Sequence, residues 1–510
     1  MSTDTAVATI AAMLAPLADV DDRGIWFDGE FVSWRDHLGY AAVMGRAVRE
    51  MLDSTRPLHV GVLSNNSPDF SALMAAAARD GFVVVGLNTT RRGAALGADI
   101  TRADCQLVFV ADDTADLIDG VDLGSVPIIN LDSAGWRRQV TVGGTEPPRI
   151  EPSPDDLLML IFTSGTTGDP KAVRCTHRTF AGAGKMLAER FGIGHDDVVY
   201  LSMPMFHSNA MIAGWTVAVA GEASIAVRRR FSARGFVDDV KRYGVTYANY
   251  VGKPVNYILA TEPAPDDASC ALRIMYGNEA SARDRQHFAD RFGCRVIDGF
   301  GSTEGGVAIT RTPDTPSDAL GPLRAPTAIV DPETGLPVTP GQVGEIVNSS
   351  GPGLFSGYYN DSEATADRLR GGIYHTGDLG WVDDEGYIHF AGRLGDWMRV
   401  DGENLAAGPI ERILLRHPAI RQVAVYGVPV EIGDEIEAVL VADGALDATE
   451  FTDFLGAQTD LGPKQWPHRV RIVDALPETA TFKTVKRTLR EQHAPATWVR
   501  QSSRYVPTAR

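Results

Sequence analysis

Residues 157–174 read LLMLIFTSGTTGDPKAVR, and this stretch decides how the rest of the chain is interpreted. An apolar run typical of a buried strand, 157–162, leads directly into a polar loop that ends in Lys171. The loop supplies four hydroxyl groups and two glycines, from Thr163, Ser164, Gly165, Thr166, Thr167 and Gly168. Glycines let backbone N–H groups converge on an anion, while hydroxyls and a lysine add further donors and positive charge. The pattern therefore predicts a phosphate-binding loop.

Two other interpretations of this loop are less well supported. Most clusters of Gly, Ser and Thr are surface turns, but the density of hydroxyl groups directly after an apolar strand favours a binding loop. The P-loop of nucleotide triphosphatases has four residues between its glycines and Ser or Thr after its lysine. Here two residues separate Gly165 from Gly168, and Ala172 follows Lys171. The P-loop motif is therefore excluded.

Length, charge and cysteine content limit the class of protein. The chain has 510 residues, enough for two or three domains, and a net charge of −18. Because nucleic-acid binding requires a basic face, no nucleic-acid partner is expected. The four cysteines are scattered without C-x-x-C spacing, which favours a reducing cytoplasm over a disulfide framework or a zinc site. We expect neither a secretory signal nor a membrane span, whereas peripheral membrane contact and a homodimer stay open.

The order of apolar segments predicts an α/β fold. Strand-like runs at 59–63, 83–87 and 106–110 alternate with helical segments such as 69–80. This spacing indicates βαβ units and a parallel sheet. The polar stretch 132–156, which contains proline, is expected to be an irregular connection. Repeated Pro and Gly residues then predict a β subdomain from about residue 320 to 392. Strand and helix patterns after residue 393 predict a small α+β domain.

The loop at 164–171 resembles the phosphate loop of the adenylate-forming superfamily, which includes acyl-CoA synthetases, luciferases and peptide-synthetase adenylation domains. Four further stretches resemble motifs of this superfamily, and they occur in its order. The motifs are SGTTGDPK at 164–171, DGFGSTEG at 298–305, YHTGD at 374–378, GRLGDWMRVDGEN at 392–404 and PETATFK at 477–483. Residues 228–259 and the Thr-Phe-Lys at 481–483 narrow the resemblance to the branch of fatty acid transport proteins and very-long-chain acyl-CoA synthetases.

The resemblance implies a site for ATP with Mg²⁺. Glu304 would be the protein ligand of Mg²⁺, which requires hard oxygen ligands, and Phe300 would offer a flat face to adenine. Asp378 would accept hydrogen bonds from both ribose hydroxyls, and Arg393 would support the ribose or the α-phosphate. The other residues implied in nucleotide or coenzyme A binding, besides the loop from Ser164 to Lys171, are Gly277, Asn278, Gly301, Ser302, Thr303 and Gly402.

The same resemblance implies the catalytic residues and the domain division. Lys483 would be the catalytic cation, and His207 would line the carboxylate pocket without acting as a base. Thr163 and Glu304 complete the predicted catalytic set. A hinge at 395–396 would join a large N-terminal adenylation domain, residues 1–392, to a small mobile C-terminal domain, residues 393–510.

The implied reaction has two halves. A carboxylate attacks the α-phosphate of Mg·ATP to give an acyl-adenylate and pyrophosphate, and the thiol of coenzyme A then attacks the acyl carbon and releases AMP. We therefore predict an ATP-dependent ligase that joins a medium- to very-long-chain carboxylic acid to coenzyme A. Three alternatives stay open: a fatty acyl-AMP ligase that loads a carrier protein, an amino acid activator, and a non-catalytic acyl binder or transporter.

Overall fold

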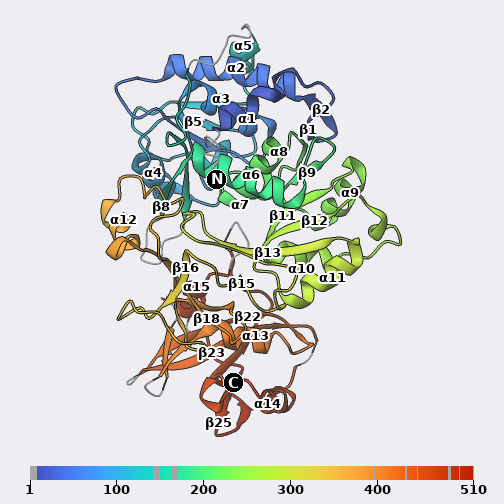
Figure 1. Ribbon diagram of the computed structural model, residues 1–510, viewed down its shortest axis with the longest axis vertical. Coiled ribbons are helices and arrows are strands. Elements are labelled where there is room, and N and C mark those ends of the chain that lie inside the picture. The colour runs from blue at the N-terminus through green and yellow to red at the C-terminus, as the bar shows by residue number, and fades with distance from the viewer. Residues whose placement is uncertain are drawn as a thin grey trace, which may run out of the picture. The chain divides into compact units, whose positions relative to one another are not determined.

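The computed structural model describes residues 9–141, 150–163, 170–394, 397–400, 403–430, 433–444, 446–479, 484–492 and 494–508. The chain forms two compact units (Figure 1), the first made of Met1–Ala308 and Pro352–Arg370, and the second of Ile309–Gly351 and Gly371–Arg510. The second unit therefore contains residues of the predicted β subdomain as well as the C-terminal residues. The domain boundary at residue 393 stays a prediction.

The first sheet of the first unit has six strands in the order β6-β5-β3-β4-β7-β8. Its strands are β3 (His59–Leu63), β4 (Val83–Gly86), β5 (Cys105–Val110), β6 (Ile128–Asn130), β7 (Leu157–Thr163) and β8 (Lys171–Thr176). All pairs are parallel except β7 with β8, which form an antiparallel pair. The parallel sheet expected from the alternating pattern is confirmed.

Helices connect these strands, as parallel pairing requires. They are α3 (Pro68–Asp80), α4 (Gly93–Arg102) and α5 (Ala134–Thr141), whereas α6 (His177–Phe191) follows β8 and leads out of this sheet. The Ser67 side chain caps the start of α3, and Gly81 ends it with a φ of 70°. Helix α5 occupies part of a stretch, 132–156, that the sequence suggested to be irregular, because Trp136 and Val140 four residues apart bury one face of it.

The second sheet of the first unit has the order β14-β13-β12-β11-β9-β10-β1-β2. Its strands are β1 (Gly24–Phe27), β2 (Glu30–Ser33), β9 (Val198–Leu201), β10 (Ser224–Val227), β11 (Tyr247–Val251), β12 (Ile274–Asn278), β13 (Arg295–Gly301) and β14 (Ala308–Thr310). The first unit ends within β14, after Ala308. The other helices of the first unit are α1 (Ile10–Leu14), α2 (Trp34–Met51), α7 (Ser208–Ala210), the π-helical turn Met211–Trp215, α8 (Thr216–Ala220), α9 (Ala233–Tyr243), α10 (Lys253–Leu259), α11 (Ala282–Phe292) and, from the returning segment, α12 (Ser362–Arg368).

The second unit contains two five-stranded sheets and a hairpin. The first sheet, in the order β15-β19-β18-β17-β16, is formed by β15 (Gly321–Pro322), β16 (Thr327–Val330), β17 (Gly344–Asn348), β18 (Tyr374–Val382) and β19 (Tyr387–Arg393). All its pairs are antiparallel, and its strands lie within about residues 320–392, where the sequence predicted a β subdomain.

The C-terminal part of this unit has the expected α+β character. Its elements are the hairpin β20 (Trp397–Val400) and β21 (Glu403–Ala406), the sheet of β22 (Ile420–Pro429), β23 (Asp434–Ala442), β24 (Arg469–Ile472), β25 (Trp498–Gln501) and β26 (Arg504–Pro507), and helices α13 (Ala407–Leu414), α14 (Ala448–Gly456) and α15 (Lys486–Glu491). Phe451 on α14 packs its ring against Trp498 and Tyr505, which fixes this helix on the sheet.

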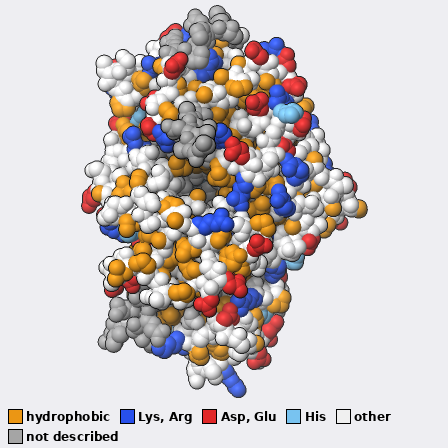
Figure 2. Space-filling view, viewed as in Figure 1, with side chains coloured by type: hydrophobic (Ala, Val, Ile, Leu, Met, Phe, Trp, Pro, Cys, Tyr) orange, Lys and Arg blue, Asp and Glu red, His pale blue; other side chains and the backbone are white. Residues whose placement is uncertain are grey.

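The surface carries charges of both signs. On the face drawn in Figure 2, acidic and basic side chains are interspersed with small apolar areas. Within the described residues, no helix combines the length and the apolarity needed to cross a membrane.

The packing of α6 gives a stability prediction. A Cβ atom added at Gly184 would lie 2.7 Å from the backbone oxygen of Thr216, whereas one added at Gly182, on the same helix, would have no atom within 4 Å. Gly184→Ala is expected to lower the free energy of unfolding by about 1–3 kcal/mol through overpacking. Gly182→Ala should raise it by about 0.5–1 kcal/mol, because alanine is the better helix former. Urea unfolding of both variants measures this, and equal effects would contradict close packing of α6 at Thr216.

Candidate active site

The predicted phosphate loop connects the two strands of an antiparallel pair. Thr163, the last residue of β7, pairs with Lys171, the first residue of β8. The Nζ atom of Lys171 lies 5.3 Å from the centre of the Tyr358 ring, within cation–π range. The predictions for Ser164, Gly165, Thr166, Thr167 and Gly168 fall on residues outside the described part of the chain.

Glu304 is a nearly buried carboxylate, with 8% of the residue exposed. The Tyr358 hydroxyl donates a hydrogen bond of 2.9 Å to its Oε1 atom, and Arg368 Nε donates one of 3.3 Å to the Tyr358 oxygen. Burial, and then the charge of Glu304, raise the pKa of the Tyr358 phenol above its usual value. The phenol therefore keeps its proton and remains a donor to the carboxylate.

The loop before Glu304 is connected to the segment of His207. Phe300 and Gly301 are the last residues of β13, and Ser302 and Thr303 follow them. The Thr303 hydroxyl forms a hydrogen bond of 2.7 Å with the hydroxyl of Ser208, the residue after His207. The structure therefore brings together two predicted site segments that are about a hundred residues apart in the sequence.

Loops at the carboxyl ends of β3 and β4 support the same segment. Asn66, after β3, donates to the Met203 carbonyl at 2.9 Å and accepts from the Met205 N–H at 2.8 Å. Gly86, the last residue of β4, faces the Phe206 backbone so closely that a Cβ atom there would lie 2.9 Å from its oxygen. Residues at the ends of two strands of the first sheet thus hold the segment that leads to His207.

Gly277 and Asn278, at the end of β12, lie beside Tyr250 of β11. A Cβ atom at Gly277 would lie 2.6 Å from Cγ of Tyr250, so only glycine fits there. The Tyr250 hydroxyl donates to Asp298 of β13, and Arg285 pairs with the same carboxylate at 2.9 Å. The Asn278 Oδ1 atom is buried without a hydrogen-bond partner among the described residues, and such an acceptor suits a donor of a bound ligand, for example the amino group of adenine.

Asp378 and Arg393 lie in the second unit, opposite each other on β18 and β19. Arg393 Nε is 3.5 Å from Asp378 Oδ1, and the arginine is the more exposed of the two side chains. Glu345, only 1% exposed, accepts a hydrogen bond of 2.8 Å from the Gly377 N–H and contacts His375 Nδ1 at 2.8 Å. Glu345 therefore supports the turn that presents Asp378.

The remaining predicted residues cannot be placed. Lys483, Gly402 and the hinge at 395–396 lie outside the described residues. Within the described residues there is no group of three or more His, Cys, Asp or Glu side chains arranged to hold a metal ion. Mg²⁺ is often bound by a protein through one or two carboxylates together with substrate phosphates. Glu304 fits this type of ligand.

Sequence reasoning missed Tyr358, Arg368 and Glu345. Each acts through a contact between residues that are not neighbours in the sequence: Tyr358 and Glu304 are 54 positions apart, Glu345 and Gly377 are 32 apart, and Arg368 and Tyr358 are 10 apart. No spacing within the sequence signals such pairs. The only local signs of these roles were Tyr358 directly after Gly357 and Glu345, an acid in the apolar strand β17.

Two protein-family models match this chain and show which family it belongs to. Residues 18–359 match the model described as AMP-binding enzyme, and residues 409–483 match the AMP-binding enzyme C-terminal domain. The chain belongs to the AMP-binding enzyme family. The predicted membership of the adenylate-forming superfamily is confirmed.

Relatives match this AMP-binding enzyme over nearly its whole length. It is 55% identical to the medium/long-chain-fatty-acid–CoA ligase FadD17 of Mycobacterium marinum, over 94% of this chain and 95% of the relative. It is 42% identical to the steroid-22-oyl-CoA synthetase of Rhodococcus jostii, over 95% and 91%. ATP-bound MatB from Rhodopseudomonas palustris has a similar structure, with a TM-score of 0.83 and 25% identity over 95% of this chain and 99% of MatB. The predicted fold class is confirmed.

The position of Glu304 leads to a direct prediction. Glu304→Gln keeps the shape of the side chain and its acceptor for Tyr358 but removes the negative charge. Loss of one preorganised electrostatic contact typically costs ~10²–10³ in rate, so pyrophosphate release in a single turnover should fall by that amount. Glu363→Gln, the same change at an exposed site on α12, is the matched control and should leave the rate unchanged. A Glu304→Gln variant as fast as the wild type would exclude this carboxylate from the reaction.

Proposed function

We propose that this AMP-binding enzyme is an ATP-dependent acid–CoA ligase that activates a medium- to long-chain carboxylic acid as its acyl-adenylate and transfers the acyl group to coenzyme A. One observation carries the proposal: the nearly buried Glu304 carboxylate is tied through Tyr358 to Lys171 of the phosphate-loop hairpin, in a chain that aligns almost end to end with a fatty acid–CoA ligase.

The first half-reaction joins two anions, so the enzyme must offset charge where it develops. Lys171 and the Thr163 hydroxyl, at the two ends of the phosphate loop, would bind the phosphates as cation and donor. Mg²⁺ bound with ATP would supply Lewis-acid stabilisation of the phosphate oxygens, and Glu304 would be its protein ligand. Lys483 would add the cation that the superfamily resemblance implies. These residues act by stabilising charge, which is usually the largest contribution to catalysis.

The other half of the site would orient the reactants. The Asp378 carboxylate, presented by the turn that Glu345 supports, suits two donors such as ribose hydroxyls. Gly277 and Asn278 would receive adenine, and His207 would line the acyl pocket. No protein base is needed, because the acid is already a carboxylate at neutral pH.

The second half-reaction requires room for the thiol of coenzyme A. We propose that residues 393–510 change orientation about the hinge at 395–396 after adenylation, bringing Gly402 towards the pantetheine and removing Lys483. We place the enzyme in the cytoplasm. All its cysteines are free thiols, and Cys105, Cys175 and Cys294 are buried, which supports a reducing compartment.

A steroid side-chain acid is a second candidate substrate, because this chain is 42% identical to a steroid-22-oyl-CoA synthetase over almost its full length. Both candidates place a large apolar group in the acyl pocket. Burial contributes ~0.8 kcal/mol per CH₂, so specificity should rise several-fold per carbon until the pocket ends.

The test compares acids and acceptors in one series. Pyrophosphate release is measured with acids from acetate to very-long-chain acids, a steroid-22-oate and free amino acids. Each active acid is then supplied with coenzyme A or with a phosphopantetheinyl carrier protein. We expect a maximum at a medium or long chain and thioester formation with coenzyme A. A maximum on acetate or amino acids, or transfer to the carrier protein alone, would contradict the proposal.

A further inference from the structure

Tyr358 contacts both Glu304 and Lys171, the residues to which the magnesium role and a phosphate role are assigned. Its hydroxyl donates to Glu304 Oε1 at 2.9 Å, and the Lys171 ammonium lies 5.3 Å from the centre of its ring. The residue is only 5% exposed. One side chain thus contacts both a predicted ligand of Mg²⁺ and a predicted ligand of the phosphates.

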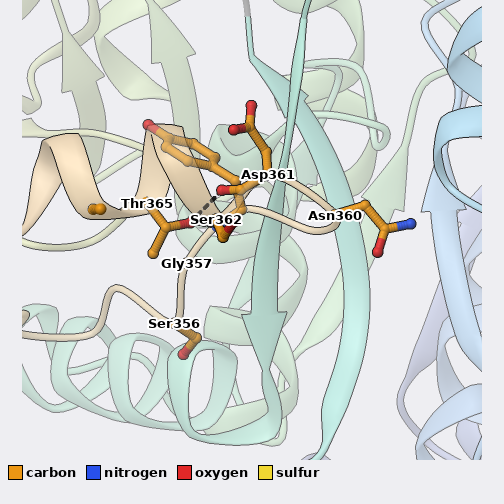
Figure 3. Close-up of a pocket in the computed structure, with 8 residues that line it drawn as sticks. Ser356, Gly357, Asn360, Asp361, Ser362 and Thr365 are labelled. Atoms are coloured by element: carbon orange, nitrogen blue, oxygen red, sulfur yellow. Dashed lines mark hydrogen bonds between the residues drawn. The ribbon is translucent and has the colours of Figure 1, made fainter.

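The backbone around Tyr358 is held from two sides. The Arg174 N–H donates to the Gly357 carbonyl at 3.1 Å, and the Tyr359 N–H donates to the Ala172 carbonyl at 2.8 Å, so the segment runs along β8. The Tyr358 N–H donates to the Thr365 hydroxyl at 2.9 Å, and Thr365 in turn donates to the Asp361 carbonyl at 2.7 Å (Figure 3). The position of the ring is therefore fixed before any ligand binds.

The segment also holds the loop of Glu304 itself. The Leu354 N–H donates to the Gly305 carbonyl at 3.1 Å, and Gly305 adopts a φ of 68°, which favours glycine. Residues from this segment, among them Gly357, Tyr358 and Thr365, line an open pocket of about 750 Å³ (Figure 3). Tyr358 is thus in a segment that links the glutamate loop with β8 and also borders open space.

The Tyr358 phenol accepts one hydrogen bond and donates another. Arg368 Nε donates to the Tyr358 oxygen at 3.3 Å, and the phenol proton is donated to Glu304. No other hydrogen bond of the Glu304 carboxylate involves a described residue. Tyr358 thus restrains the Oε1 atom of the carboxylate.

We propose that Tyr358 is a positioning residue that orients the Glu304 carboxylate towards magnesium-bound ATP and aligns it with Lys171. The inference rests on the proposed function. A carboxylate without this donor must lose more rotamer freedom when it binds the metal, so removing the hydroxyl weakens the magnesium-dependent part of nucleotide binding.

The test uses two neighbouring tyrosines. Tyr358→Phe removes the hydroxyl that contacts Glu304, whereas Tyr359→Phe removes one that donates to Asp104 at 2.9 Å and is the matched control. The full chain is titrated calorimetrically with α,β-methylene-ATP, once with Mg²⁺ and once with EDTA. Substitution beside a metal ligand typically costs 10- to 100-fold in metal affinity. We therefore expect the increase in affinity that Mg²⁺ gives to be about 10-fold smaller for Tyr358→Phe than for the wild type. Its affinity in EDTA should equal that of the wild type, and Tyr359→Phe should be unchanged in both conditions.

The outcomes distinguish failure of the inference about Tyr358 from failure of the proposed function. If Tyr358→Phe retains the full magnesium-dependent gain, the inference is overturned while the proposed function stands. If the wild type does not bind the analogue, the proposed function itself fails. Equal loss of affinity with and without Mg²⁺ would make Tyr358 a structural residue and would also overturn the inference. Arg368→Gln, which removes the donor to the phenol, is a second variant and should show a smaller loss in the same direction.

Discussion

A carboxylate taken out of water needs a hydrogen-bond donor, because an unpaired buried charge is strongly unfavourable. Glu304 meets this constraint through Tyr358, and Tyr358 is held in turn by β8 and by Thr365 of α12. The segment that returns to the first unit after residue 351 therefore does more than complete the packing. It connects the strand that begins at Lys171 with the loop that carries Glu304.

The two sheets of the first unit explain how distant motifs come together. Parallel strands end at one edge of a sheet, so residues after their carboxyl ends gather there. Asn66 after β3 and Gly86 at the end of β4 contact the segment that leads to His207, and the next residue, Ser208, bonds to Thr303. In the second unit, Asp378 depends in the same way on a long-range contact, since Glu345 on the neighbouring strand holds the turn before it.

Many elements of the fold and part of the candidate site could be predicted from the sequence, for reasons that particular residues make clear. Strand 59–63 was predicted to the residue, because the short apolar run comes soon after Pro57 and is followed directly by the polar stretch 64–67. Helix α5 was missed, because its two buried residues stand in a polar stretch containing proline. Glu304 and Thr303 were recognisable as parts of a local motif, and the roles assigned to them stay predictions. Tyr358 and Glu345 were not, since their roles come from tertiary contacts that no local pattern records.

The central claim is that the acid is activated at the α-phosphate of ATP. It can be tested with a carboxylic acid labelled with ¹⁸O in both carboxyl oxygens, incubated with the enzyme, ATP, Mg²⁺ and coenzyme A. Because the carboxylate oxygen becomes the bridge of the acyl-adenylate, the account predicts one ¹⁸O atom in AMP and none in pyrophosphate, measured by mass spectrometry. Label in inorganic phosphate together with formation of ADP would show attack at the γ-phosphate and would contradict the account.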